Sequence, residues 1–297
     1  MKLVTYQTNG QAQLGAISND QIIDLGQAYR AMAGHDSASF PDDMIALLKE
    51  ADEGLAKAQA AIDFAEANGG FSQSLEQVTF LPPVVKPGKV IALGRNYAAH
   101  AKEGGAQPPK YPMLFHKTAT SLLGAGGTIV IPPVTKRVDY EAELAVIIGR
   151  TCKQVSEEEA LDYVAGYAAA NDVSARDLQR RTSQFSAGKM VDTFGPLGPA
   201  LVTRDEVPDP QNLRIQTRLN GQVMQDSNTK MMIFSVAFTI SYISQITTLE
   251  VGDVILTGTP EGVGFARKPP VYLKEGDVVT IEVEGVGTLT NSVIEQR

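Results

Sequence analysis

The residues that decide the fold are Asp139-Tyr140-Glu141-Ala142-Glu143-Leu144-Ala145-Val146-Ile147-Ile148-Gly149. Their apolar second half predicts a buried β-strand, which ends in a turn at Gly149. Alternate side chains of a strand share one face, so Glu141 and Glu143 point the same way, about 7 Å apart along the strand. Two such carboxylates either form a solvated strand edge or bind a hard cation, because Mg²⁺, Mn²⁺ and Ca²⁺ prefer oxygen ligands. The rest of the chain decides between these two interpretations.

The composition is that of a soluble globular protein. The 297 residues suffice for one large domain with or without a small one, and 43% of them are hydrophobic and 20% charged. A net charge of −8 argues against nucleic acid or an anionic membrane as a partner. The most apolar run, 231–246, is interrupted by serine and threonine and predicts a buried helix, not a membrane span. Cys152 is the only cysteine, which favours a reducing compartment, and the polar start of the chain does not predict a signal peptide, so we expect a cytoplasmic protein.

Residues 1–80 predict a small N-terminal α+β domain, and residues 81–297 predict the catalytic domain. Strands are expected at 3–8, 12–18 and 21–24, with turns between them, and helices are expected at 42–51 and 55–68. Pro82-Pro83 and Pro87-Gly88 mark the boundary. The first part contains no candidate catalytic group, and we expect His35 to lie in a loop.

A short helix that carries a histidine and a glutamate follows a predicted strand at 89–93. Asn96 is a candidate N-cap and Gly104-Gly105 a candidate stop, so His100 and Glu103 are neighbours on one helical face. A carboxylate beside an imidazole orients the ring and raises its basicity, which suits a general base. The alternative is a surface ion pair of little consequence. Because glycines flank the helix, it is also a candidate lid.

A third carboxylate ends a second predicted buried strand at 164–173. Asp172 needs a partner there, and convergence on Glu141 and Glu143 would complete a facial set of oxygen ligands. Such a set leaves positions open for water or a substrate.

The helix predicted at 175–181 offers groups that suit an oxo acid. Ser174 is its candidate cap, and Arg176 and Gln179 lie on one side of it. Arginine suits a carboxylate and glutamine a carbonyl oxygen. We expect Arg180-Arg181 to be surface charges.

Several other segments either have two possible interpretations or have no predicted chemical role. Lys189 lies among small residues and is a candidate pocket residue, although a single lysine usually lies at the surface. The glycine-rich stretch 257–264 lets a backbone approach a ligand but lacks the ending of a phosphate loop. Arg267-Lys268-Pro269-Pro270 either binds a second carboxylate of the substrate or forms an exposed basic turn. We expect His116 to be packed, and the acidic run 157–159 to begin a helix.

Taken in order, these segments closely resemble the fumarylacetoacetate hydrolase superfamily over roughly residues 82–295. The resemblance is carried by Gly94-Arg95-Asn96-Tyr97 with His100 and Glu103, Asp139 to Leu144, Asn171 to Gln179, Lys189, and Thr257 to Gly264. It is greatest to the branch that contains acylpyruvate hydrolases, oxaloacetate decarboxylases and 2-hydroxyhepta-2,4-diene-1,7-dioate isomerases of aromatic catabolism. It implies a mainly β fold of the α+β type, with a rolled, barrel-like mixed sheet, a small N-terminal domain and a homodimer.

The resemblance also implies the roles of particular residues. Mg²⁺ or Mn²⁺, with Ca²⁺ as an alternative in a crystal, would be held by Glu141, Glu143 and Asp172. The catalytic residues would be His100, Glu103 and Lys189, and the substrate-binding residues would be Arg176, Gln179 and Thr259. Some members have a further acidic ligand where this chain has only apolar residues at 90–93, so we expect a water molecule in that place.

The expected activity is metal-dependent hydrolysis of a C–C bond in a 2,4-dioxo acid, such as an acylpyruvate or fumarylpyruvate. His100 would activate water, and the pyruvate enolate that leaves would be held by the metal and Lys189. Without the hydrolytic water step, the same site would serve decarboxylation of the oxaloacetate type, tautomerisation, or isomerisation of a dienoate. Hydration of a dienoate on the same site is a further alternative. A more distant alternative is a metal-binding scaffold without catalysis.

Overall fold

The computed structural model describes residues 1–34 and 39–296, and the loop predicted around His35 lies outside them. The strands are β1 (Lys2–Thr8), β2 (Gln11–Ser18), β3 (Gln21–Asp24), β4 (Ser72–Ser74), β5 (Thr79–Leu81), β6 (Val90–Gly94), β7 (Met113–Lys117), β8 (Leu122–Leu123), β9 (Thr128–Ile131), β10 (Val138–Asp139), β11 (Ala142–Ile148), β12 (Val164–Asn171), β13 (Ser174–Ala175), β14 (Gly195–Thr203), β15 (Arg214–Leu219), β16 (Gln222–Asn228), β17 (Val254–Leu256), β18 (Val278–Val283) and β19 (Gly287–Glu295). The α-helices are α1 (Leu25–Ala33), α2 (Met44–Lys49), α3 (Ala51–Asn68), α4 (Ala98–Glu103), α5 (Arg176–Gln179), α6 (Ser186–Lys189) and α7 (Val236–Ile246). Short 3₁₀ turns include η3 (Ala160–Tyr163) and η6 (Gly264–Ala266).

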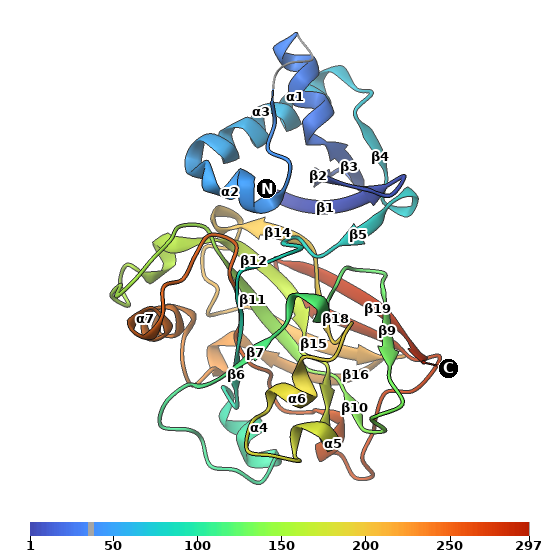
Figure 1. Cartoon of the computed structure of the whole chain (residues 1–297), viewed down its shortest axis with the longest axis vertical. Helices are drawn as coiled ribbons and strands as arrows, with labels where there is room; N and C mark the ends of the chain where they lie inside the picture. Colours follow the sequence, from blue (N-terminus) through green and yellow to red (C-terminus); the bar gives the residue numbers. More distant parts are fainter. Residues whose placement is uncertain (35–38, 297) are drawn as a thin grey trace.

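Two mixed sheets form the body of the molecule (Figure 1). The larger has twelve strands and runs β4-β3-β2-β1-β14-β12-β11-β17-β6-β7, with β5 and β8 attached to its side. The smaller has five strands in the order β16-β15-β18-β19-β9. The prediction of a mainly β fold with a mixed sheet is therefore confirmed.

The quoted strand lies between two hydrophobic cores. Every residue of β11 is buried. Leu144 and Val146 pack into the core shared with the five-stranded sheet, whereas Ala145 and Ile147 pack into the core beneath the N-terminal helices. A strand that is buried on both faces has a nearly continuous apolar sequence, which explains the pattern.

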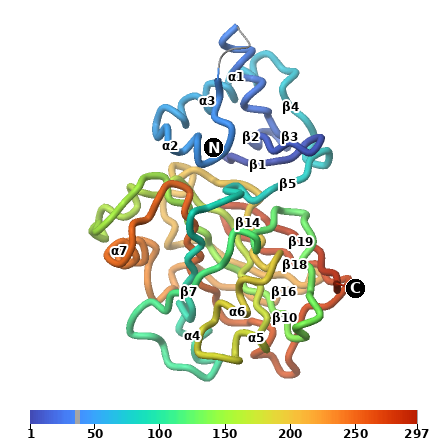
Figure 2. The backbone as a smooth tube through the Cα atoms, viewed as in Figure 1, coloured from blue at the N-terminus to red at the C-terminus, as the bar shows by residue number. Residues whose placement is uncertain are grey.

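The N-terminal part extends the large sheet. β1 pairs with β14, and α1 and α3 cover the strands on one side (Figures 1 and 2). The three predicted strands and the two predicted helices are confirmed. α1 was not predicted. Because strands from both parts share one sheet, the division of the chain at residue 80 stays a prediction.

The acidic run at 157–159 does not begin a helix. It forms turns that lead into η3, and the Ser156 hydroxyl donates to Glu159 Oε2 at 3.1 Å. The Glu159 amide also donates to the Ser156 hydroxyl at 3.3 Å, as at a helix start, but the segment that follows is the short 3₁₀ turn η3 and not an α-helix.

The two predicted helix caps are also wrong. Asn96 donates to the carbonyls of Thr257 at 2.7 Å and Phe234 at 3.0 Å, and Tyr97 occupies the N-cap position of α4. Ser174 belongs to β13 and donates to the Asp172 carbonyl at 2.8 Å. In both cases the side chain donates to a backbone carbonyl outside the helix and does not cap the helix. For Asn96 these carbonyls are distant in the sequence, and for Ser174 the carbonyl precedes the helix.

His116 is exposed, not packed. It lies on β7, the last strand of the large sheet, where Phe115 and Lys117 point inward and His116 points outward. The alternation of a strand with one open face explains this placement.

Candidate active site

The three candidate metal-ligating carboxylates converge at one end of the central strands. β11 and β12 are antiparallel and pair Ala142 with Asn171, so Glu141 and Asp172, one step outside this pair, are neighbours. The Asp172 amide donates to the Glu141 carbonyl at 2.9 Å. Together with Glu143, these residues bring carboxylate oxygens within 4.8 Å of one another, and all three are buried.

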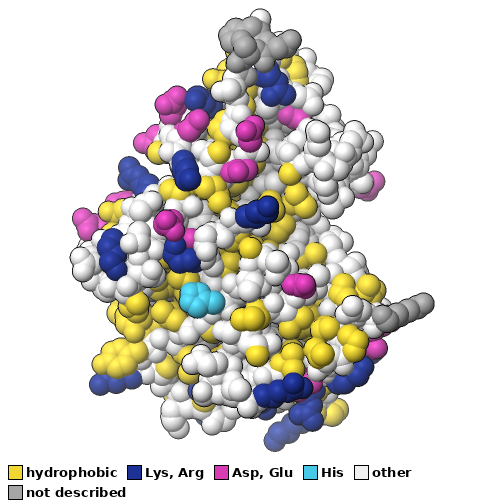
Figure 3. All heavy atoms as spheres, in the orientation of Figure 1, with side chains coloured by type: hydrophobic (Ala, Val, Ile, Leu, Met, Phe, Trp, Pro, Cys, Tyr) yellow, Lys and Arg dark blue, Asp and Glu magenta, His cyan; other side chains and the backbone are white. Residues whose placement is uncertain are grey.

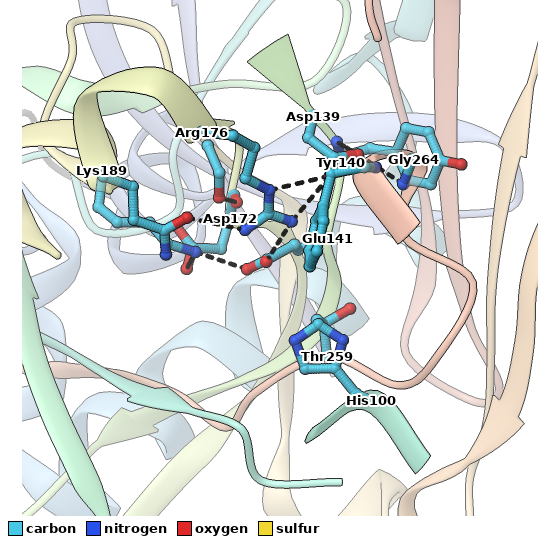
Figure 4. A network of polar contacts seen from close by, with 12 residues as sticks. His100, Asp139, Tyr140, Glu141, Asp172, Arg176, Lys189, Thr259 and Gly264 are labelled. Atoms are coloured by element: carbon cyan, nitrogen blue, oxygen red, sulfur yellow. Dashed lines mark hydrogen bonds and ion pairs between the residues drawn. The ribbon is translucent and has the colours of Figure 1, made fainter. Parts of the chain in front are cut away.

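Buried cations compensate most of this negative charge (Figure 4). Lys189 Nζ lies 2.6 Å from Glu141 Oε2 and 2.6 Å from Asp172 Oδ2. Lys117 Nζ lies 2.7 Å from Asp172 Oδ1, and Arg176 Nη2 lies 2.7 Å from Glu141 Oε1. Glu141 and Asp172 therefore each lie between two cations.

The fold fixes the position of Lys189 in two ways. Lys117 donates to the Lys189 carbonyl, which ties α6 to β7. The preceding Gly188 lets α6 approach α5 closely, since a Cβ there would lie 2.6 Å from the Ala175 carbonyl oxygen and from Gln179 Cβ. The ammonium group is thus held against the carboxylates.

Asp139 connects Arg176 to the glycine-rich loop. Its carboxylate accepts from Arg176 Nε at 2.9 Å, from the Gly264 amide at 2.7 Å and from the Phe265 amide at 3.0 Å. Asp139 is fully buried. The sequence predicts no role for Asp139, although it lies only two residues before Glu141.

Glu143 is the exception among the four buried carboxylates of the site, since it forms no ion pair within residues 1–34 and 39–296. Its Oε2 accepts from the Gly258 amide at 2.7 Å. Gly258 has φ of 94°, and a Cβ there would lie 2.7 Å from Asn96 Cβ, so only glycine fits. Burial raises the pKa of Glu143 well above its ordinary value, and the charges of Asp172 and Glu141 raise it further.

The charges of the neighbours set the other pKa values. Burial alone would raise the pKa of Glu141, but Lys189 and Arg176 hold it below its usual range. Burial opposes a charge on Lys189, yet Asp172 and Glu141 raise its pKa. For Lys117, burial prevails and lowers the pKa.

The donor set fits a hard divalent cation. Four buried carboxylates (Asp139, Glu141, Glu143 and Asp172) face three buried cations (Lys117, Arg176 and Lys189). The unbalanced carboxylate is Glu143, which lies next to the oxygens of Glu141 and Asp172. Oxygen ligands of this kind suit Mg²⁺ or Mn²⁺, and the ion would leave the site with a net positive charge that favours an anionic substrate.

The predicted dyad lies across the cavity from this cluster. His100 Nδ1 lies 2.8 Å from Glu103 Oε1, and Glu103 Oε2 accepts from the Gly262 amide at 2.9 Å. In Figure 4, Glu141 lies between Arg176 and His100, with Thr259 next to the imidazole. Because Glu103 holds Nδ1, the Nε2 atom of His100 is left for the cavity.

A cavity of about 100 Å³ joins the carboxylate cluster to α4, and both His100 and Lys189 line it. The candidate substrate-binding residues Arg176, Gln179 and Thr259 lie in its wall. Gln179 Oε1 accepts from Arg176 at 3.1 Å, and Thr259 Oγ1 accepts from Gln225 at 2.8 Å. All nine candidate site residues are thus near one another. From the sequence alone it stayed open whether Lys117 faces a pocket, and in the structure it pairs with Asp172 of this set.

Comparison with known proteins agrees with the motif-based resemblance. The family model described as fumarylacetoacetate (FAA) hydrolase C-terminal matches residues 89–294. The chain is 50% identical over 219 residues to an oxaloacetate tautomerase, Fahd2a, of Rattus norvegicus, which covers 73% of this chain and 70% of the relative. It is 42% identical over 300 residues to the oxaloacetate tautomerase fahd2 of Xenopus laevis, covering 99% and 90%.

A solved structure with a bound metal is also similar. Maleylpyruvate hydrolase from Sphingobium sp. SYK-6, in complex with manganese(II) ion and pyruvate, superimposes with a TM-score of 0.78. The two sequences are 31% identical, and the match covers 100% of both chains.

The prediction of a cytoplasmic protein is wrong, because both curated relatives are named mitochondrial. A single buried cysteine, Cys152, fits any reducing compartment and does not distinguish among them. Among the described residues, no helix has the length and apolar character that crossing a bilayer would require.

Proposed function

The chain belongs to the fumarylacetoacetate hydrolase family, and on that premise we propose that it interconverts the keto and enol forms of a small 2-oxo dicarboxylate such as oxaloacetate. The observation that carries the proposal is the His100–Glu103 dyad facing a buried, cation-rich carboxylate cluster across one small cavity. The 50% identity to an oxaloacetate tautomerase supports this reaction over the others that the site could perform.

Glu141, Glu143 and Asp172 would hold the Mg²⁺ or Mn²⁺ ion. When bound, the ion supplies Lewis acidity, which polarises the 2-oxo group and acidifies the neighbouring C–H bonds.

His100 is the proposed base. Glu103 holds its Nδ1, so Nε2 would take one proton from C3 of the keto form, and the imidazolium would return a proton to the C2 oxygen. The bond electrons of C–H become the C2–C3 double bond, so nothing else is consumed. Lys189, already charged beside Glu141 and Asp172, would stabilise the negative charge that develops on the C2 oxygen.

C–C bond hydrolysis of a 2,4-dioxo acid is the second candidate. The same dyad could activate water, and a solved maleylpyruvate hydrolase is 31% identical. The higher identity to the tautomerases favours tautomerisation. The homodimer stays a prediction, which light scattering would test.

The test follows the ultraviolet absorbance of enol oxaloacetate, with Mg²⁺ or Mn²⁺ alone as the background. We expect the protein to accelerate the loss of the enol, EDTA to remove the acceleration, and no pyruvate to accumulate. Pyruvate formed at the same rate would instead indicate decarboxylation. No acceleration would refute the proposal and direct the test to acetylpyruvate hydrolysis.

A further inference from the structure

Two arginines at the outer end of the cavity are not used by the carboxylate cluster. Arg95 follows β6 and is half-buried, whereas Arg180 follows α5 and is exposed. Both line the same cavity as Glu141 and Lys189. Within residues 1–34 and 39–296, neither guanidinium group has an ion pair or a hydrogen bond to the protein.

Aromatic rings hold both guanidinium groups. Arg180 lies over the Phe265 ring, 4.5 Å from its centroid, and Arg176 lies 4.6 Å from the same centroid. Arg95 lies over the Phe185 ring at 5.8 Å. A guanidinium group stacked on a ring keeps its edge donors free, and these match a carboxylate in two-point geometry.

A second wall of the cavity also has an arginine at its outer end, aromatic rings in the middle and a cation at its inner end. The Phe185 ring lies 6.1 Å from that of Phe115, and Lys189 Nζ lies 5.0 Å from the Phe115 centroid. Each wall therefore has an aromatic surface with one cation at the inner end and one at the outer end.

The inner and outer cations differ in whether their charges are already paired with carboxylates of the protein. Arg176 and Lys189 are paired with buried carboxylates at 2.6 to 2.9 Å. Arg95 and Arg180 keep their charge available to a ligand. Lys and Arg side chains also gather at the lower end of the face in Figure 3, where Figure 1 draws α5 and β10.

We propose that Arg95 and Arg180 bind the carboxylate of the substrate that lies farthest from the metal-ligating residues, and so select dicarboxylic over monocarboxylic oxo acids. This inference rests on the proposed function, because it concerns the substrate of the same site. It replaces the hypothesis that Arg267 binds this group, since Arg267 donates to the Gly262 carbonyl at 3.3 Å and to the Met224 carbonyl.

The first test measures binding and needs no turnover. Titration calorimetry with the Mn²⁺-loaded protein compares L-malate with L-lactate, which lacks the second carboxylate. We expect malate to bind at least about tenfold more tightly, the size expected for charge-assisted hydrogen bonds. In the double variant R95Q/R180Q this preference should disappear, R180K should keep part of it, and R181Q, an exposed neighbour outside the cavity lining, should keep all of it.

The second test separates this inference from the proposed function. Turnover of oxaloacetate is compared with that of its 4-methyl ester, which has nearly the same shape without the distal charge. We expect R95Q/R180Q to lower kcat/KM for oxaloacetate at least about tenfold and to leave the ester unchanged. Equal losses for both compounds, or a double variant that still prefers malate, would overturn the arginine assignment and leave the tautomerase proposal standing. The wild-type protein could instead prefer malate through these arginines and yet have no effect on enol oxaloacetate. That result would support the assignment of Arg95 and Arg180 and would refute the proposed tautomerase activity.

Discussion

The two ends of the cavity are built on different physical principles. At the inner end, Glu141, Asp172 and Lys189 are buried and joined by ion pairs of 2.6 Å. At the outer end, Arg95 and Arg180 rest on aromatic rings and are at least partly open to solvent. Removal of one inner partner leaves a buried charge with less compensation, whereas removal of an outer arginine leaves no buried charge unpaired. If the proposed function is correct, the inner end would serve stability and chemistry together, and the outer end could change the choice of substrate at little structural cost.

The largest expected effect separates two glutamates of the same cluster. Glu141→Gln should lower the free energy of unfolding of the metal-free protein by about 3–5 kcal/mol, because it breaks two buried ion pairs at once and leaves Lys189 with only Asp172, and Arg176 with only Asp139, as a carboxylate partner. Glu143→Gln should not lower it, because Glu143 has no ion pair and its neighbours already raise its pKa. Urea denaturation in EDTA measures both, and calorimetry should find Mg²⁺ binding weakened in both. Equal destabilisation by the two variants would contradict this view of the inner end.

His100→Ala should lower the rate of enol loss by about 10²–10⁴-fold, the range of general acid–base catalysis, and leave Mg²⁺ binding intact. Glu103→Gln should have a smaller effect, since the imidazole stays in place but its orienting charge is lost. The exposed Glu261→Gln is the matched control. A His100→Ala variant with the wild-type rate would remove the dyad from the mechanism.

Metal affinity should rise with pH. A divalent ion needs Glu143 ionised, and its pKa is raised in the metal-free protein, so a proton competes with the ion at lower pH. Below that pKa the affinity should increase by up to about tenfold per pH unit, and above it the affinity should level off. Calorimetry in buffers of different ionisation enthalpy counts the proton released. Affinity that stays constant across mildly acidic and neutral pH would mean that Glu143 is already ionised.

The smallest effect concerns Arg267, which does not line the cavity. Arg267→Ala should lower the free energy of unfolding by about 1–3 kcal/mol, because the carbonyls of Gly262 and Met224 lose a charged donor. The KM for oxaloacetate should not change. A raised KM without a loss of stability would return Arg267 to the set of substrate-binding candidates.

The sequence predicted the inner end better than the outer end, for a physical reason. Glu141, Glu143 and Asp172 are placed by strand alternation and by the pairing of neighbouring strand ends, and both follow from local patterns. The predicted buried strand at 164–173 is confirmed as β12, and the apolar run at 231–246 contains α7.

The residues that escaped prediction depend on distant partners. Nothing near Lys117 in the sequence indicates that it meets Asp172, 55 positions away. Arg180 has the exposure predicted for it, but only the fold brings Phe265 beneath it and the cavity beside it. Helix α1 was missed because it begins directly after β3: Asp24 ends the predicted strand and is also the N-cap of the helix, where its side chain accepts from the Gln27 amide.

Glu103 touches both sides of the entrance: one oxygen holds the imidazole of His100, and the other accepts from the Gly262 amide. If α4 moves as a lid, the second bond breaks when the cavity opens, and the carboxylate becomes free to turn toward water. His100 and Glu103 lie on the same helix, so the pair would move away from the carboxylate cluster as a unit. Proton transfer and product release would then occupy separate intervals of the catalytic cycle, and a reactive enol would meet bulk water only after the base had been withdrawn from it.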